Sequence, residues 1–299
     1  MKPSPFSYHA PSSTAQALEV LAEVGEDGKV LAGGQSLIPI LNMRLAAPAH
    51  LVDVNGLADE LGYVRVSDDA VEVGALARHA EVERHPAAGR ALPLLGQALR
   101  NVAHPVVRNR GTVVGSLAHA DPSGEMTAVL ALLGGSVELA SSSGRRTVDA
   151  GDFFIGPLES AVAPGELAVS ARFPLSPPCT GTEVAEVARR HGDYAVCGVV
   201  AAVTLDEENR VARARAAYLS MSDTPVVLEL TEPVAGAAAD AAEWGAAGEI
   251  AREQLHPESD IHASAEYRRE LAGVLTARAL RTAAARATSN GHGEGRGGE

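Results

Sequence analysis

Leu31-Ala-Gly-Gly-Gln-Ser36 lies between a predicted short strand, Lys29–Ala32, and an apolar stretch, Leu37–Leu45. Paired glycines can adopt positive φ angles and allow a ligand to approach the backbone closely. A helix that starts after such a loop directs N–H groups and the positive end of its dipole toward it. The pattern suits a phosphate group, with Ser36 either capping the helix or binding a phosphate oxygen. It is also typical of a plain tight turn, and it is neither a Gly-x-Gly-x-x-Gly fingerprint nor a P-loop.

A second loop with glycine and hydroxyl residues, Arg110-Gly-Thr-Val-Val-Gly-Ser116, also precedes a predicted helix, Glu125–Leu133. Residues 108–116 are dense in turn formers, which predicts a turn-rich loop. Asp121 and Glu125 can accept hydrogen bonds from sugar-like hydroxyl groups, although Asp121-Pro-Ser-Gly124 is also ordinary turn and cap chemistry. Two such loops ahead of helices favour a cofactor that contains a diphosphate.

The composition narrows the class of partner. The chain has 299 residues, of which 46% are hydrophobic, and a formal net charge of −13, so it predicts a folded globular protein that binds no nucleic acid. No apolar run approaches the ~20 residues of a membrane span. No secretory signal is visible, and the two cysteines, Cys179 and Cys197, are expected to be reduced thiols in a cytoplasmic protein. Two thiols cannot by themselves build a zinc site or an iron–sulfur cluster.

The histidines predict no catalytic or metal-binding set. His79 and His85 have no metal-ligand spacing with carboxylates and are expected at the surface. No convincing Ser/His/Asp or Cys/His arrangement is visible, so an enzyme that works without a cofactor has no candidate nucleophile.

Periodicity and turn residues predict a chain of mixed helices and strands with one clear boundary. Three prolines in Pro174-Leu-Ser-Pro-Pro178 cannot continue a helix or a central strand. The elements expected before this boundary are a starting strand, the helices Ala15–Val24, Leu92–Val102 and Glu125–Leu133, and the strands Leu51–Val54, Tyr63–Val66, Ala70–Val73, Ser136–Leu139, Arg146–Val148 and Leu167–Phe173. Those expected after it are the strands Glu183–Ala188, Gly198–Leu205 and Val211–Ser220 and the helices Ala238–Glu253 and Ala263–Ala285.

Several motifs, taken together and in order, resemble one flavoprotein family. The segments that carry the resemblance are Ala32-Gly-Gly-Gln-Ser-Leu-Ile-Pro39, Arg44-Leu-Ala-Ala-Pro48, His50-Leu-Val-Asp53, Gly74-Ala-Leu76, Arg108-Asn-Arg-Gly-Thr112, Arg190-His-Gly-Asp-Tyr-Ala195 and Ala265-Glu-Tyr-Arg-Arg269. They are similar to the FAD-binding medium subunits of the molybdenum hydroxylases, the group of aerobic carbon monoxide dehydrogenase and xanthine dehydrogenase. The resemblance runs from about residue 4 to residue 286.

The resemblance implies an α+β fold of the PCMH type, which is the vanillyl-alcohol-oxidase-like FAD-binding fold. Its expected parts are an FAD-binding subdomain at 1–55, a second at 56–174, a C-terminal sheet-and-helix domain at 179–286 and a disordered tail at 287–299. FAD is expected between the first two parts.

The family's roles carry over to individual positions of this chain. The first loop would wrap the FAD pyrophosphate, and the second would contact the pyrophosphate and ribityl chain, while the acids at 121 and 125 would bind hydroxyl groups and an aromatic ring at 194 would lie near the isoalloxazine. The residues so implied are Ala32, Gly33, Gly34, Gln35, Ser36, Leu37, Thr112, Gly115, Ser116, Asp121, Glu125 and Tyr194.

The chain departs from the family pattern at two of these places. Val114 stands where the family has a glycine, and because a β-branched residue resists positive φ, either the loop takes another path or the glycine was not needed for φ. Glu125 stands where the family has an aspartate, and the proline that follows in the family is replaced by Thr127.

The resemblance also implies partners. A large chain with a molybdenum cofactor would oxidise the substrate, and a small chain with two [2Fe–2S] clusters would relay electrons to the FAD of this chain, which passes them to a quinone, NAD⁺ or another acceptor. The expected assembly is a hetero-oligomer, a dimer of heterotrimers. Two alternatives stay open: a stand-alone FAD-dependent oxidoreductase with its own small-molecule substrate, and an interaction subunit without FAD.

Overall fold

The computed structural model describes residues 2–291, with side chains to Ser289, and divides them into two compact units. The first unit contains residues up to Ala91 together with His104–Asp121 and Gly134–Pro174; the second contains Leu92–Ala103, Pro122–Leu133 and the residues from Leu175 onward. The division at 174/175 falls in the proline-rich segment. Two segments from the expected second subdomain, 92–103 and 122–133, therefore belong to the second unit.

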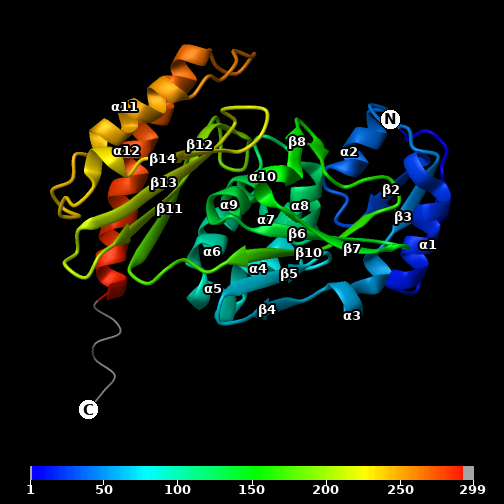
Figure 1. Cartoon of the computed structure of the whole chain (residues 1–299). Helices are drawn as coiled ribbons and strands as arrows, with labels where there is room; N and C mark the ends of the chain where they lie inside the picture. The colour runs from blue at the N-terminus through cyan, green and yellow to red at the C-terminus, as the bar shows by residue number, and fades with distance from the viewer. Residues whose placement is uncertain (1, 292–299) are drawn as a thin grey trace. The chain divides into compact units, whose positions relative to one another are not determined.

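The first unit begins with a small parallel sheet in the order β1-β3-β2 (Figure 1). A parallel pair needs a crossover, and the glycine loop with α2 is the crossover between β2 and β3. The elements up to this point are β1 (Ser7–His9), α1 (Thr14–Val24), η1 (Gly25–Asp27), β2 (Gly28–Leu31), α2 (Leu37–Asn42), β3 (His50–Asp53), η2 (Asn55–Leu57) and α3 (Ala58–Leu61).

A five-stranded antiparallel sheet, β4-β5-β10-β6-β7, forms the rest of the first unit's framework. The predicted hairpin of β4 and β5 is confirmed, and α8 packs against β10 and β5. Its elements are β4 (Val64–Val66), β5 (Ala70–Gly74), α4 (His79–Arg84), α5 (Pro86–Ala91), α7 (Pro105–Arg108), α8 (Val113–His119), β6 (Ser136–Ser141), β7 (Gly144–Asp149), α10 (Ala150–Phe153), β8 (Phe154–Gly156), β9 (Glu159–Ser160) and β10 (Leu167–Pro174).

The second unit is built on a four-stranded antiparallel meander, β11-β12-β13-β14. Its elements are α6 (Pro93–Leu99), α9 (Glu125–Leu133), β11 (Thr180–Ala188), β12 (Ala195–Leu205), β13 (Val211–Leu219), β14 (Val226–Glu229), η3 (Glu232–Val234), α11 (Trp244–Gln254) and α12 (Ala265–Gly291). Nearly every residue of β12 is buried, so both faces of the sheet are covered.

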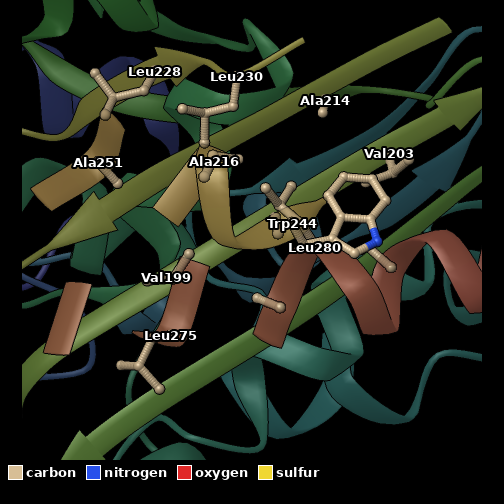
Figure 2. Close-up of a cluster of buried hydrophobic side chains, with 14 of the residues drawn as sticks. Val199, Val203, Ala214, Ala216, Leu228, Leu230, Trp244, Ala251, Leu275 and Leu280 are labelled. Atoms are coloured by element: carbon tan, nitrogen blue, oxygen red, sulfur yellow. The ribbon is translucent and has the colours of Figure 1, made fainter. Parts of the chain in front are cut away.

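One face of this sheet carries an extended apolar core. Val199 and Val203 of β12 lie with Trp244 of α11 and Leu275 and Leu280 of α12 in one cluster, as Figure 2 shows. Residues of α9 are absent from that cluster although α9 packs on β12, β13 and β14, so α9 covers the opposite face.

The C-terminal helix extends further than predicted. Residues 287–291 continue α12 instead of forming part of a disordered tail, and Ala287 is buried in the apolar cluster. Alanine-rich sequence with one face on a sheet is enough to continue the helix. The rest of the expected tail, 292–299, lies outside the described residues. Among the helices of the described chain, none is both long and apolar enough to cross a bilayer.

Candidate functional site

The first glycine loop connects the carboxyl end of β2 to α2 and contains a row of backbone donors. Gly34 adopts a φ of 69°, a left-handed conformation that favours glycine, and the Gln35 Nε2 donates to the carbonyl oxygen of Gly33 at 3.0 Å. Within the described chain, the N–H groups of residues 33–36 donate to no protein acceptor. Consecutive N–H groups without an internal acceptor fit an anionic phosphate.

Ser36 is the residue before α2, but its hydroxyl makes no capping hydrogen bond. Ser36 was predicted either to cap the helix or to bind a phosphate oxygen, and it does not cap the helix. Ala32 and Leu37, at the two ends of the loop, are half-buried.

The second loop is more regular than predicted, because its last residues form α8. Thr112 is the N-cap: its buried Oγ1 accepts from the backbone N of Gly115 at 3.1 Å, and its carbonyl accepts from the N of Ser116 at 3.0 Å. The prediction of a turn-rich loop over residues 108–116 was wrong for residues 113–116. These residues become helical because Val113, Val114 and Leu117 are buried.

Val114 stands where the family has a glycine, and its backbone conformation shows whether a glycine is needed there. It lies in α8, is buried, and is absent from the described non-glycine residues with positive φ. The second of the two alternatives therefore holds: a glycine is not needed for the φ angle at this position.

The structure brings the two loops into direct contact within the first unit. A Cβ atom at Gly33 would lie 2.6 Å from the carbonyl oxygen of Arg110 and 2.7 Å from the Cα of Gly111. Both atoms belong to the backbone, so no side-chain rotation relieves the overlap. Glycine is needed at this position because the second loop approaches it.

The backbone of His79 is hydrogen-bonded to the second loop. Its backbone N donates to the Gly111 carbonyl at 3.0 Å, and the N of Val113 donates to the Ala77 carbonyl at 3.3 Å. The expectation of a surface histidine was wrong, since His79 is 5% exposed. Burial lowers the pKa of His79 to about 4, so the ring is neutral near pH 7. No group of described residues has the composition and spacing to hold a metal ion.

The remaining predicted site residues are described in their own units. Asp121 ends the first unit's segment, whereas Glu125 is the first residue of α9 in the second unit. Tyr194 lies in the loop between β11 and β12, is 69% exposed, and follows an ion pair in which Arg190 Nε lies 3.2 Å from Asp193 Oδ2. The roles of Asp121, Glu125 and Tyr194 stay predictions.

Sequence reasoning missed two residues beside the loops, Asn55 and Arg78. Asn55 Nδ2 donates to the Ala32 carbonyl at 2.9 Å, and Arg78 Nη1 donates to the Arg110 carbonyl at 2.5 Å. The parallel pairing of the strands before Ala32 and Asn55 was a usable signal for Asn55, since residues after neighbouring parallel strands meet at one edge.

Comparisons with known proteins agree over nearly the whole chain. Residues 4–176 match the family described as the FAD binding domain in molybdopterin dehydrogenase, and residues 183–283 match the CO dehydrogenase flavoprotein C-terminal domain. The chain is 38% identical over 288 residues to the 6-hydroxypseudooxynicotine dehydrogenase complex subunit alpha of Paenarthrobacter nicotinovorans, covering 96% of this chain and 97% of that protein.

Two further relatives give the same result. The carbon monoxide dehydrogenase medium chain of Afipia carboxidovorans is 36% identical, with 96% of this chain and 99% of that protein covered. Among solved structures, quinoline 2-oxidoreductase from Pseudomonas putida 86 superposes with a TM-score of 0.89 at 36% identity, over 96% of this chain and 99% of that chain.

Proposed function

The chain belongs to the FAD-binding medium subunits of the molybdenum hydroxylases, and from this premise we propose that it carries electrons between a partner chain and an external acceptor. It is an oxidoreductase subunit of α+β fold, and its cofactor is FAD. The electrons would come from [2Fe–2S] clusters of a small partner chain, after a large molybdenum-cofactor chain has oxidised the substrate.

The observation that carries the proposed FAD site is the row of N–H groups at residues 33–36 beside the second loop. These groups would bind the pyrophosphate, with the Ser36 hydroxyl as a further donor and Ser116 at the neighbouring helix start. Bound FAD supplies the redox chemistry, because its ring accepts and releases the electrons. The protein's part is to hold the cofactor and exclude other orientations.

Three of the implied residues would act outside the pyrophosphate cradle. Asp121 and Glu125 would accept hydrogen bonds from the ribityl hydroxyls, and Tyr194 would lie near the isoalloxazine ring. The subdomain bounds 1–55 and 56–174 for the FAD-binding part belong to the same proposal.

The cysteine content supports a role that depends on partners. A [2Fe–2S] cluster needs four ligands, usually cysteine thiolates, and this chain has two cysteines. The clusters would therefore reside on a separate chain, in an assembly we take to be a dimer of heterotrimers. A cytoplasmic location accords with Cys179 and Cys197, which form no disulfide.

The departure at Val114 does not favour the stand-alone oxidoreductase alternative. Its motivation was the departure of this chain from the family at Val114 and Glu125. Val114 occupies ordinary helical backbone, so that departure does not indicate a different loop.

The experiment is to purify the chain from its native host with a C-terminal affinity tag. Co-purification of a cysteine-rich small chain and a large chain, and FAD reduction by substrate only in their presence, would support the proposal. Recovery of the yellow chain alone, with turnover of a small-molecule substrate by itself, would favour the stand-alone enzyme instead.

A further inference from the structure

Asn55 links the ends of two neighbouring parallel strands. Leu31 of β2 lies opposite Asp53 of β3, so the residues that follow each strand meet at one edge of the sheet. The Asn55 Nδ2 donates to the Ala32 carbonyl oxygen at 2.9 Å and to Asp53 Oδ1 at 2.6 Å. A single side-chain amide therefore attaches the first glycine loop to the start of η2.

The orientation of this amide is fixed by its partners. Burial raises the pKa of Asp53, but hydrogen bonds from the Tyr8 hydroxyl and from Asn55 outweigh it and hold the pKa below its ordinary value. An ionised carboxylate only accepts hydrogen bonds, so the NH₂ group of Asn55 must face it. The amide oxygen is left to face a donor.

That donor is Arg78, which also reaches the second loop. Its Nη2 donates to Asn55 Oδ1 at 2.7 Å, and its Nη1 donates to the Arg110 carbonyl oxygen at 2.5 Å. The guanidinium is planar and presents its donors as a rigid fork. The two loops are thus joined in series: Ala32 carbonyl, Asn55, Arg78, Arg110 carbonyl.

The direction of the loop's N–H groups depends on this series. In a trans peptide the C=O and the following N–H point in opposite directions. When Asn55 holds the Ala32 carbonyl, it therefore also aims the N–H of Gly33 to the other side. Gln35 has the same effect one residue later, because its Nε2 holds the Gly33 carbonyl and so aims the N–H of Gly34.

We infer that Asn55 and Arg78 are positioning residues for the FAD pyrophosphate. They fix the spacing of the two glycine loops and the direction of the donors on the first. This inference rests on the proposed FAD site and adds the residues that hold it ready for the cofactor.

The test uses the full chain, stripped of FAD and titrated with FAD while flavin fluorescence is followed. Asn55→Ala and Arg78→Ala are each expected to raise the FAD dissociation constant about tenfold or more, as for loss of a hydrogen bond to a charged group. The double variant is expected to bind FAD only slightly less tightly than whichever single variant binds it less tightly, because both residues act through one series of contacts. The free energy of unfolding of each FAD-free variant is measured beside the titration, because a residue that merely stabilises the fold would lower that free energy and leave the FAD dissociation constant of the folded chain unchanged.

Control variants separate the possible outcomes. Arg145→Ala removes an arginine of β7 whose Nη1 lies 3.0 Å from Glu138 Oε2, and it is expected to leave FAD binding unchanged. Arg78→Lys keeps the charge but not the fork, so it should recover little of the affinity and serves if Arg78→Ala does not fold.

Two results distinguish this inference from the proposed function. If Gly33→Val abolishes FAD binding while Asn55→Ala and Arg78→Ala bind FAD like the unmodified chain, the positioning role is overturned and the FAD site stands. If the unmodified chain binds no FAD at all, both fail together.

Discussion

The substitution Gly33→Ala tests the contact between the two glycine loops. The added Cβ would lie 2.6 Å from the Arg110 carbonyl oxygen, whereas a relaxed carbon–oxygen contact is about 3.3 Å, so the loops must separate by about 0.7 Å. Because both sides of the contact are backbone, the adjustment has to come from the loops themselves. Overpacking of this kind costs about 1–3 kcal/mol.

The cost should appear in FAD affinity, since the cofactor requires the native spacing of both loops. At about 1.4 kcal/mol per tenfold change, the dissociation constant is expected to rise roughly 5- to 150-fold. The assay is fluorescence titration of the FAD-free full chain, with Gly151→Ala as the matched control. Apart from its chain neighbours and the backbone of its own helix, no heavy atom lies within 4 Å of a Cβ at Gly151, so this control should bind FAD normally. Equal FAD affinity for Gly33→Ala and the unmodified chain would refute the reasoning.

Three further predictions concern stability and pH. Thr112→Val removes the cap of α8 and is expected to lower the free energy of unfolding by about 1 kcal/mol in urea denaturation, whereas Thr112→Ser should retain most of it; equal losses would contradict the capping role. Burial raises the pKa of Glu186 to about 7, so the folded chain holds a proton that the unfolded chain releases near pH 4.5, and stability falls as the pH rises from about 4.5 to 7. Glu186→Gln should remove that fall and be more stable than the unmodified chain above pH 7 by about 2–3 kcal/mol; an unchanged pH profile would count against it. His79 has the opposite sign: its pKa is lowered to about 4, so the unfolded chain binds the extra proton and stability is lost as the pH falls from about 6.5 toward 4. Flavin fluorescence should then report FAD release over that range, and His79→Asn should release FAD less steeply with pH.

The sequence predicted the elements whose own residues determine them. The apolar run that ends at Gly134-Gly135 predicted the helix Glu125–Leu133, and those bounds are confirmed. The β4–β5 hairpin is likewise set by alternating apolar residues around an acidic turn. The strand, glycine loop and helix at the start of the chain were predicted because each signal lies within a few residues.

The elements that were missed depend on distant parts of the chain. Residues 113–116 contain valines and a glycine, which lower helix propensity, and they become helical because Thr112 caps them and their apolar side chains are buried. The N of Val113 donates to Ala77 and the N of His79 donates to Gly111, each across more than thirty positions in the sequence, which no local pattern reveals.

The support of the candidate site was missed for the same reason. Asn55 and Arg78 are 23 positions apart, and their contact with both loops follows from strand register and a long-range bridge between Arg78 and Thr112. Strand pairing was a usable signal for Asn55, but Arg78 is a single polar residue without periodicity, and no local pattern connects it to either loop.

The central claim is that backbone donors of the first loop, held against the second loop, bind the diphosphate of FAD. The most direct measurement is the FAD content of the purified full chain, from the flavin absorbance near ~450 nm and the protein concentration. We expect close to one FAD per chain, and the loss of that flavin in Gly33→Val with the fold retained. A colourless chain that takes up no added FAD, or a Gly33→Val chain with normal flavin content, would contradict the account.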